Sequence, residues 1–436
     1  MKSLLRPVLL FTVFIACSLA AQVTFHVVAD MRQYSEPAGL TEPSPNLFYL
    51  QAGQAILSVT PEGKLTVLAT APSDYVMGSP PVTAANGRSY TAYGAAQTNY
   101  PISLRFTPNS QATYPAVTLG PGFIQGLPDG RLFGTAGEFL TGLYYLIAGD
   151  EAGQIAPVYQ FPSGQVPMSP IYASDGNYYG VSWANKGPQA GASYVFQVTP
   201  AGVQTKVVDL PDGVFGSGYS GSFFQGADGN FYGTTAAGGA TGGGALYQVT
   251  MDGQYSLVYS FGTGVHSTPG ITLQGSDGNF YGVTRGATGP VSYGEIFQLT
   301  PTGRYTGLHL MKGGDGVCPC WLTQASDGIF YGTAVTGGRS GVGTVFALDA
   351  GLPKPAPQAL SFTPQSGAVG QPVRIWGYNL LSAAVRFNGA AATEVSSAGS
   401  NYVWATVPAG ATSGPITVAT PGGVTRTAAS FTLEPR

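Results

Sequence analysis

The sequence has few charged residues. Asp, Glu, Lys and Arg together make up 9% of its 436 residues, whereas about a quarter is usual for a soluble domain. The formal net charge is −3, and Lys and Arg form neither a cluster nor a groove interleaved with aromatic residues. Nucleic acid is therefore excluded as a partner, because neutralising phosphates requires a basic face.

Histidine and cysteine are also scarce, with three of each. His26, His266 and His309 lie far apart in the sequence, and no set of carboxylates at metal-ligand spacing accompanies them. The motifs of zinc peptidases, of hydrolases with a nucleophilic serine and of phosphate-binding loops are absent as well. We therefore expect no metal, no cofactor and no catalytic residue that a motif identifies.

Long hydrophobic runs are missing after the N-terminus. One apolar run, Val8 to Ala16, follows two basic residues and precedes small residues at Ser18 and Ala20. This layout is typical of a secretory signal and is too short for a membrane span. We expect residues 1–21 to be a cleaved signal peptide, with lipidation at Cys17 as the alternative. The mature chain would then be secreted or at the cell surface, with no transmembrane segment.

Glycine, proline and aromatic residues are abundant, and they recur with a repeated phrase. The chain has 64 Gly, 33 Pro and 12% aromatic residues. Asp-Gly-Asn-Phe-Tyr-Gly occurs at 228–233 and 277–282, with close variants at 175–180 and 327–332. Weaker copies start at Asp129, Asn86 and Asn46, so that successive copies lie 40 to 53 residues apart. This spacing is typical of four-stranded propeller blades.

A second phrase follows the first by about twenty residues in each clear unit, as in Ile296-Phe-Gln-Leu-Thr-Pro-Thr-Gly303. Each unit is therefore expected to contain a strand, an Asp-Gly turn, a strand, a Gly-rich loop, a strand, a Thr-Pro-x-Gly turn and a strand. Gly adopts the positive φ that a tight hairpin needs, and an Asp side chain hydrogen-bonds the local backbone. We interpret the carboxylates at 175, 228, 277 and 327 as turn formers rather than as metal ligands or catalytic groups.

The two ends of the repeat region are incomplete in complementary ways. Residues 22–29 look like a strand with no partner before them, and the last unit stops after its third strand at 343–348. Pairing of these two segments would close a ring without open strand edges. The sequence thus predicts an all-β chain in which residues 22–351 form a seven-bladed β-propeller of four-stranded repeats.

The repeats resemble the tandem repeat called GloVer, which is found in exported bacterial proteins. The resemblance rests on Ser/Ala-Asp-Gly-Asn-Phe-Tyr-Gly followed by a Gly-rich stretch and Val/Ile-Phe-Gln-Leu-Thr-Pro, and it is strongest over 171–350. It implies a secreted repeat protein and brings no catalytic residues, because no chemistry is assigned to that family.

A Pro-rich linker at 352–357 precedes a second module at 358–436. Short alternating strands separated by Gly and Pro turns predict an immunoglobulin-like β-sandwich there. The segments 360–367, 370–380, 385–391 and 414–418 also make this module resemble the IPT/TIG domain. The resemblance implies a spacer, an adhesive module or an appendage of a carbohydrate-active enzyme. Trp376 is expected to be buried, with an exposed ligand platform as the alternative.

By analogy of fold, propellers present ligands on the connections between the second and third strands and between successive blades. Aromatic rings near Arg or Lys on such a face can stack on sugars or peptides. The alternative is that these side chains are merely exposed and scattered over loops. The candidate ligand-binding residues are Trp183, Tyr219, His266, Arg285, Tyr293 and Arg339.

Cys318-Pro-Cys320 is the remaining unusual motif. Once the signal is removed, these are the two cysteines of the chain. A disulfide between residues two apart would be strained. A local disulfide and free thiols are both possible, whereas metal binding lacks further ligands.

The leading functional hypothesis is an exported, monomeric, non-catalytic protein that binds or adheres to an extracellular glycan or protein through the propeller loops. One alternative is a polysaccharide-active hydrolase or lyase, which requires acidic groups, or a base beside a cation, to meet at the central funnel. A surface spacer without a ligand is a further alternative. The acidic candidates for the enzyme are Asp150, Glu151, Asp209, Asp212 and Asp315.

Overall fold

The computed structural model describes most of the chain after the N-terminal segment. The described residues are 23–70, 75–77, 82–83, 89–95, 101–107, 110–113, 120–126, 132–138, 143–149, 155–184, 193–211, 220–286, 293–397 and 399–435. The predicted signal peptide and Tyr219 lie outside them. Within these ranges the chain is all-β, apart from one 3-10 turn, η1 (Gly264–His266). No helix in the described part has the length and hydrophobicity needed to span a bilayer.

Seven antiparallel sheets, numbered here in chain order, account for the strands up to residue 349. Sheet 1 contains β2 (Ala38–Ser44), β3 (Leu47–Ala52), β4 (Ala55–Val59) and β5 (Leu65–Thr70). Sheet 2 contains β6 (Tyr75–Met77), β7 (Val82–Thr83), β8 (Ser89–Ala95), β9 (Pro101–Thr107) and β10 (Ser110–Thr113). Sheet 3 contains β11 (Gly120–Gly126), β12 (Leu132–Glu138), β13 (Leu143–Gly149) and β14 (Ile155–Gln160). Sheet 4 contains β15 (Gln165–Tyr172), β16 (Tyr178–Ala184), β17 (Ser193–Val198) and β18 (Gln204–Leu210).

The remaining three sheets follow the same pattern. Sheet 5 contains β19 (Ser220–Gln225), β20 (Phe231–Thr235), β21 (Ala245–Val249) and β22 (Tyr255–Ser260). Sheet 6 contains β23 (Pro269–Gln274), β24 (Phe280–Thr284), β25 (Glu295–Leu299) and β26 (Tyr305–Leu310). Sheet 7 contains β27 (Val317–Gln324), β28 (Phe330–Thr336), β29 (Thr344–Asp349) and β1 (Thr24–Asp30). The prediction of four strands per repeat is wrong for sheet 2, where β6 and β7 both pair with β8 to give five strands.

The Asp-Gly phrase forms the turn between the first two strands of a sheet. In sheet 5, Asp228 Oδ1 accepts the Asn230 backbone N–H (3.1 Å), and Oδ2 accepts the Tyr232 hydroxyl (2.8 Å). Gly229 follows with φ 83°. Burial raises the pKa of Asp228, but the hydrogen bonds from Tyr232 and Asn230 together lower it below its usual value. The interpretation of these carboxylates as turn formers is confirmed.

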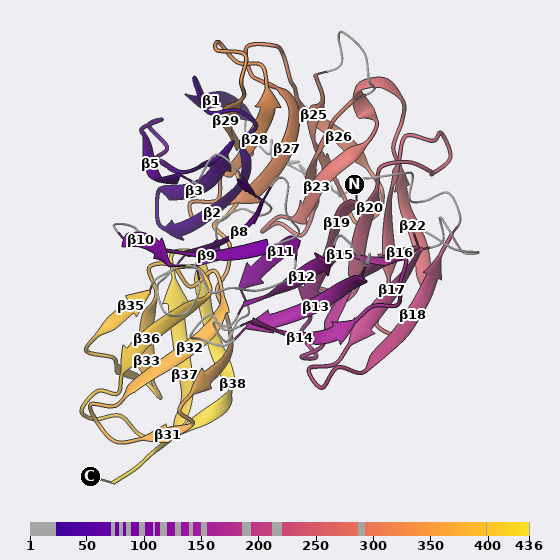
Figure 1. Cartoon of the computed structure of the whole chain (residues 1–436). Coiled ribbons are helices and arrows are strands. Elements are labelled where there is room, and N and C mark those ends of the chain that lie inside the picture. The colour runs from indigo at the N-terminus through magenta and orange to yellow at the C-terminus, as the bar shows by residue number, and fades with distance from the viewer. Residues whose placement is uncertain are drawn as a thin grey trace, which may run out of the picture.

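The opening strand pairs with the last repeat, as its sequence predicted. β1 runs antiparallel to β29, from Thr24 opposite Asp349 to Asp30 opposite Thr344. Figure 1 shows β1 beside β29, next to the strands of sheet 1. The unpaired edge of β29 is thereby covered.

Neighbouring sheets are joined by a hydrogen bond that recurs along the chain. A backbone N–H at an Asp-Gly turn donates to a side-chain oxygen at the end of the first strand of the next sheet. The pairs are Ser174 to Gln225 (2.8 Å), Ala227 to Gln274 (2.7 Å), Ser276 to Gln324 (2.9 Å) and Ser326 to Glu42 (2.8 Å). The last pair joins sheet 7 to sheet 1 across 284 positions of sequence.

A glycine–proline contact recurs in the same way. A glycine just before the third strand lies so close to a proline of the next sheet that a Cβ would come within 2.8 Å of the proline Cδ. Only glycine permits this approach. The pairs are Gly244 with Pro269, Gly294 with Pro319 and Gly343 with Pro37. Sheet 7 therefore contacts sheet 1 as sheets 5 and 6 contact the sheets that follow them.

The C-terminal part forms two further sheets around a core of its own. The first contains β30 (Gln358–Thr363), β32 (Pro372–Tyr378), β36 (Tyr402–Thr406) and β35 (Val395–Ser397). The second contains β31 (Ser366–Gly367), β38 (Gly423–Leu433), β37 (Gly414–Thr420), β33 (Ala384–Phe387) and β34 (Ala390–Ala391). Ile375, Val403, Val418 and Phe431 are among the buried residues between them.

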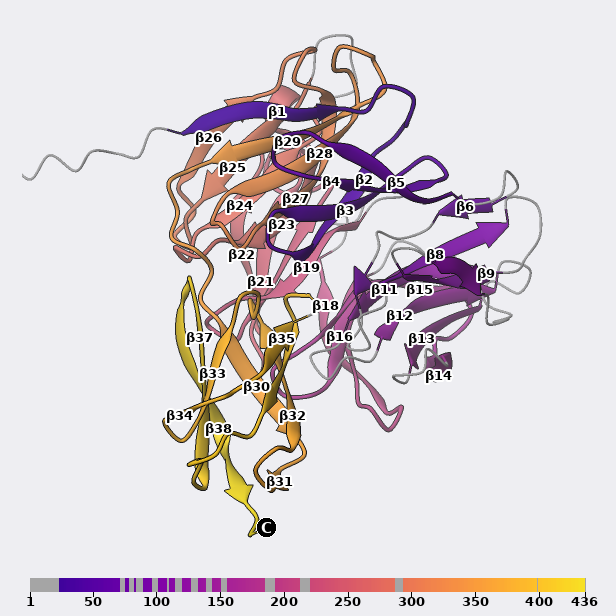
Figure 2. The same cartoon turned by 90° about the vertical axis from the view of Figure 1, so that its left-hand side faces the viewer.

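Trp376 faces away from that core and is nevertheless only 6% exposed, so it is buried and is not a ligand platform. Its ring lies 4.7 Å from the Arg374 guanidinium carbon. Residues 350–357 contain no strand, and Pro353 O accepts the Ser276 hydroxyl at the Asp-Gly turn of sheet 6 (2.5 Å). Figure 2 shows the C-terminal sheets below the repeat sheets. Asn379 and Pro421 of the C-terminal part also line one pocket with Ser326 and Asp327 at the Asp-Gly turn of sheet 7. The C-terminal part thus contacts the repeats on the side of their Asp-Gly turns.

Candidate functional site

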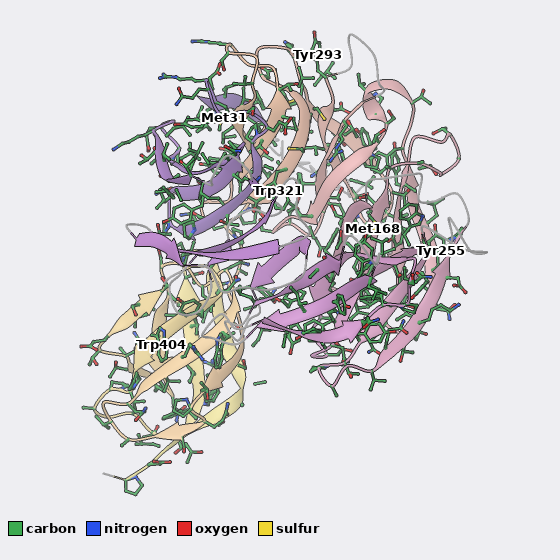
Figure 3. All side chains as sticks on the ribbon, viewed as in Figure 1. Met31, Met168, Tyr255, Tyr293, Trp321 and Trp404 are labelled. Atoms are coloured by element: carbon green, nitrogen blue, oxygen red, sulfur yellow. The ribbon has the colours of Figure 1, made fainter. Side chains whose placement is uncertain are left out.

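Because the strands of each repeat sheet are antiparallel, the segments that connect them lie at two opposite ends of the strands. These two ends of a sheet are called its edges here. In sheet 6 the Asp-Gly turn (275–279) and the Thr-Pro-x-Gly turn (300–304) lie at one edge, here called the turn edge. The incoming connection (261–268) and the described ends of the segment between β24 and β25 (285–286 and 293–294) lie at the other, the loop edge. Because the C-terminal sheets contact the turn edge, the loop edge faces away from them. Figure 3 places Tyr293, at the loop edge, and Trp404, in the C-terminal part, at opposite ends of the molecule.

At the loop edge of sheet 6, the η1 segment is bound tightly to the end of β24. Three hydrogen bonds join the two segments. They are Thr284 Oγ1 to Val265 O (2.5 Å), Arg285 N to Thr268 O (3.1 Å) and Gly286 N to Ser267 O (3.2 Å). Thr268 has φ 55°, which turns the chain into β23. His266 and Arg285 consequently lie on adjoining backbone segments.

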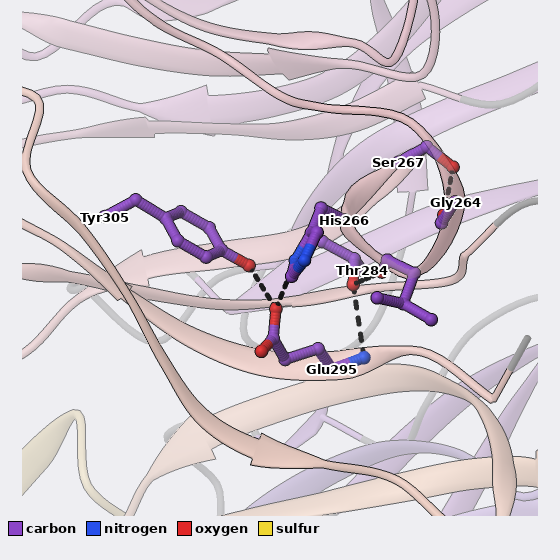
Figure 4. Close-up of polar contacts among 7 residues, drawn as sticks. Gly264, His266, Ser267, Thr284, Glu295 and Tyr305 are labelled. Carbon is purple, nitrogen blue, oxygen red and sulfur yellow. Dashed lines mark hydrogen bonds and ion pairs between the residues drawn. The ribbon is translucent and has the colours of Figure 1, made fainter.

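His266 contacts a buried carboxylate that the sequence had not indicated. Glu295, the first residue of β25, is 7% exposed. Its Oε2 atom lies 2.8 Å from His266 Nδ1 and accepts the Tyr305 hydroxyl at 2.5 Å (Figure 4). Burial and the contact with Glu295 both raise the pKa of Tyr305. The His266 side chain remains 49% exposed, so the group links the interior of the sheet to solvent.

Gly307 provides the space for this carboxylate. A Cβ at Gly307 would overlap Glu295 Oε1. The Tyr305 ring packs against the rings of Phe297 and of Tyr259 in sheet 5, with ring centroids 5.4 Å and 5.3 Å apart. The Glu295 carboxylate therefore occupies the space that a side chain at Gly307 of β26 would fill. It also contacts an aromatic stack that joins sheets 5 and 6.

The other repeats show that Glu295 and Gly307 are exceptional. The register position of Glu295 holds uncharged residues in three other sheets: Tyr194 in sheet 4, Ala245 in sheet 5 and Thr344 in sheet 7. The register position of Gly307 holds Lys206 in sheet 4 and Leu257 in sheet 5. This paired departure from the repeat is a signal that sequence reasoning missed.

The structure brings three of the predicted site residues to the loop edge of sheet 6: His266, Arg285 and Tyr293. The Arg285 side chain lies over Gly270, and the Tyr293 ring lies beside Gly313. Tyr293 O also accepts the Cys318 backbone N–H (3.3 Å). These residues come from three segments that the sheet topology places together.

The other predicted site residues lie elsewhere. Trp183 is in strand β16 opposite Ser193, not in a loop as predicted, and it is partly buried. Its sheet, sheet 4, does not include the His266 segment. Arg339 lies in the connection between β28 and β29, and its backbone N–H donates to Asp30 Oδ2 (2.6 Å). Tyr219 is outside the described residues.

The two cysteines are free thiols, so the local disulfide that the sequence allowed is not formed. The reason is a register shift between Pro319 and Trp321. Cys320 Sγ there contacts Pro37 O (3.5 Å) and Thr333 Oγ1 (3.4 Å) at the junction of sheets 7 and 1. Burial raises the pKa of Cys320 to about 11. It also raises the pKa of Cys318, against a smaller opposite effect of the Arg285 charge.

The acidic residues proposed for an enzyme do not converge in the described part of the chain. Asp209 pairs with Lys206 on the exposed outer strand β18 (2.8 Å). Asp315 pairs with His309 Nε2 between β26 and β27 (3.0 Å). Asp150, Glu151 and Asp212 lie outside the described residues. Among those described, no group of three or more His, Cys, Asp and Glu residues could hold a metal ion.

Comparisons with known proteins agree with a repeat architecture. The family described as the Gloeobacter/Verrucomicrobia repeat matches residues 166–372, which hold β15 to β29 and reach into β32. No curated protein matches the chain.

Three similar solved structures have low sequence identity. A fungal alcohol oxidase in complex with copper is 13% identical, with 94% of this chain and 99% of that chain covered (TM-score 0.45). An oligogalacturonate lyase from Vibrio parahaemolyticus is 9% identical, with 70% and 74% covered (TM-score 0.38). The extracellular domain of a proposed one-component system from B. thetaiotaomicron is 11% identical, with 92% and 52% covered (TM-score 0.48). The repeat match identifies the chain as a repeat-containing bacterial protein.

Proposed function

We propose that this is an exported, monomeric, non-catalytic protein that binds an extracellular glycan or protein through the loop edge of a closed seven-bladed β-propeller. Residues 22–351 form the propeller, 352–357 the linker and 358–436 an immunoglobulin-like domain of the IPT/TIG type. Seven sheets, the pairing of β1 with β29 and the recurring contacts between sheets 7 and 1 support the closed ring.

One observation carries the binding role: the loop edge of sheet 6 holds a half-exposed imidazole next to a segment with an arginine and a tyrosine. His266 is supported from behind by Glu295, and Arg285 follows β24 on the adjoining segment. Binding faces of proteins are commonly built from a few such anchored side chains on a rigid scaffold. The linker and the C-terminal domain contact the turn edge, at the opposite side of the sheets from these residues.

The test is a binding screen of the mature chain, residues 22–436, against glycans and extracellular proteins. For any ligand found, His266→Ala and Arg285→Ala are compared with His26→Ala, an exposed histidine on β1 that serves as the matched control. Loss of a hydrogen bond predicts affinity about tenfold weaker for the first two variants and unchanged affinity for the control. Equal affinity in all three variants would place the binding site elsewhere, and no ligand in the screen would favour a spacer.

A second candidate function is that of a polysaccharide lyase, in which the same residues would have catalytic roles. His266, backed by Glu295, would act as the base, and Arg285 on the adjoining backbone segment, whose side chain lies over Gly270, would supply the cation that such an enzyme requires. The purified protein would then release unsaturated products from an acidic polysaccharide, detected by ultraviolet absorbance. His266→Ala would abolish that release.

A further inference from the structure

Glu295 is buried and Tyr305 is partly buried, and both contact His266. We propose that Glu295 and Tyr305 fix the His266 ring so that its Nε2 atom accepts a hydrogen bond from a hydroxyl group of a neutral glycan. This inference rests on the proposed binding function and names the ligand class for that site.

The tautomer follows from the donors and acceptors around Glu295. An ionised carboxylate can only accept hydrogen bonds, whereas a neutral imidazole donates from one nitrogen and accepts at the other. Glu295 Oε2 accepts the Tyr305 hydroxyl and lies 2.8 Å from His266 Nδ1. The proton of a neutral ring therefore lies on Nδ1, and Nε2 carries the lone pair. A carboxylate behind a histidine fixes the tautomer in the same way at metal sites.

The orientation of the ring is fixed by its neighbours. The His266 and Tyr305 rings meet edge to face, with centroids 5.8 Å apart and planes at 87°. The short η1 turn that carries His266 is bound to β24 by the Thr284 hydroxyl. No hydrogen bond to Nε2 comes from any residue that the structure describes, while about half of the side chain is exposed. The structure thus presents a preorganised acceptor at the loop edge.

The surroundings favour a saccharide over a protein partner. Protein interfaces need a core of large aromatic or aliphatic anchors. The loop edges of sheets 5 and 7 beside this site, residues 236–244 and 337–343, contain Gly, Ala, Thr, Ser, one Arg and a single Val. Sugar hydroxyls, by contrast, donate single hydrogen bonds and need no apolar anchor. A buried carboxylate behind the acceptor also disfavours an anionic ligand.

The repeat itself provides a comparison within the molecule. Sheet 5 has a tyrosine, Tyr255, at the register position of Tyr305, but Ala245 replaces the glutamate. The tyrosine therefore belongs to the fold of both sheets, whereas Glu295 and Gly307 are specific to sheet 6. Burying the Glu295 carboxylate requires two residues that differ from the repeat, Glu295 itself and Gly307. Such a coordinated difference is expected where the carboxylate has a function.

The first experiment needs no ligand. Nitrogen-15 NMR of the histidine side chains of the full mature chain, at about pH 8 where histidine is neutral, is expected to show His266 with its proton on Nδ1. Glu295→Ala should abolish that preference, Tyr305→Phe should weaken it, and the signal of His26 should change in neither variant. A proton on Nε2, or a doubly protonated ring, in the wild-type chain would overturn the inference.

The second experiment uses a neutral glycan found in the binding screen and its singly deoxygenated derivatives. We expect His266→Ala to weaken binding about tenfold and His266→Gln, which keeps an acceptor near the same place, to weaken it less than threefold. One deoxy derivative should bind the wild-type protein about tenfold more weakly than the parent glycan and bind His266→Ala equally.

The outcomes separate the two proposals. Failure of the wild-type chain to bind any glycan or protein would refute the proposed function. The NMR measurement needs no ligand, so it would still test whether Glu295 fixes the tautomer of His266. Glycan binding that is unaffected by His266→Ala would refute only the present inference. His266-dependent binding of a protein, with no glycan bound, would overturn the assignment of ligand class.

Discussion

The contact between the first and last sheets can be tested at Gly63. This residue ends the turn between β4 and β5 with φ 82°, and a Cβ there would overlap the backbone oxygen of Val28 on β1. Gly63→Ala therefore perturbs two things at once: the left-handed backbone and the contact of sheet 1 with β1. Gly229→Ala is a matched control, because Gly229 has φ 83° and nothing within 4 Å of its Cβ position.

The magnitudes of the two effects differ enough to be separated. A left-handed conformation disfavours a residue with a Cβ by about 1–2 kcal/mol, and this applies equally to both glycines. Overlap with backbone atoms adds about 1–3 kcal/mol, because neither strand can move without breaking its ladder. Gly229→Ala should then lower the free energy of unfolding by about 1–2 kcal/mol, and Gly63→Ala by about 2–5 kcal/mol.

The assay is urea unfolding of the mature chain, followed by fluorescence, with the midpoint and slope fitted for each variant. Gly303→Ala provides an intermediate case, because its Cβ would lie 3.0 Å from the oxygen of Val258 in sheet 5. Equal destabilisation by Gly63→Ala and Gly229→Ala would mean that Val28 does not abut Gly63. That result would refute the closure of the ring through β1.

Three further predictions concern other contacts. Glu42 lies at the junction of sheets 7 and 1, at the position where the other junctions have glutamine. Burial raises the pKa of Glu42. The contribution of Glu42 to stability is therefore full below the pKa of an unfolded glutamate and is lost as the pH rises through the folded pKa. Glu42→Gln should raise the urea midpoint at neutral pH and have little effect at about pH 4, and a change of the same size at both pH values would contradict this. Cys318 and Cys320 should both react with a thiol reagent after denaturation, and Cys320 should react slowly in the native protein because its pKa is raised to about 11; a mass two units lower in intact protein that has not been reduced would instead indicate a disulfide. Gly307→Leu should destabilise the wild-type chain by about 1–3 kcal/mol and be neutral in the Glu295→Ala background, as measured by a double-mutant cycle in urea; equal effects in both backgrounds would show that Gly307 does not accommodate Glu295.

Local chemistry explains why the sequence predicted the repeat units well. The turn at Asp228-Gly229 is determined by a carboxylate that hydrogen-bonds the chain two residues later and by a glycine with positive φ. Neither interaction depends on the rest of the fold. The pairing of β1 with β29 was also predictable, since a unit missing one strand and a strand missing its unit must meet if no edge is left open.

The candidate site was only half predictable for the opposite reason. His266 was recognised as a rare residue in a connection, but its partner Glu295 is on β25 and the hydroxyl that completes the group is on β26. Their meeting depends on the pairing of β25 with β26 and on the absence of a side chain at Gly307. No local pattern encodes such a contact. Cys318 and Cys320 show the converse, because their spacing suggested a disulfide whereas a register shift carries Cys320 into a junction between sheets.

Repeats separate the residues that build this fold from those that do something else. A residue type that returns at the same register in several sheets, such as the Asp-Gly turn or the glycine against a proline, is explained by the geometry that those sheets share. A residue that appears in one sheet only has no such explanation, and when it is a buried carboxylate it also opposes folding through the loss of its hydration. Glu295 is such a residue, and Gly307 on the neighbouring strand removes the side chain that would exclude it. The geometry of the repeat does not explain the burial of Glu295. Glu295 contacts His266, whose side chain is half-exposed, so Glu295 acts on the solvent-facing surface through this histidine.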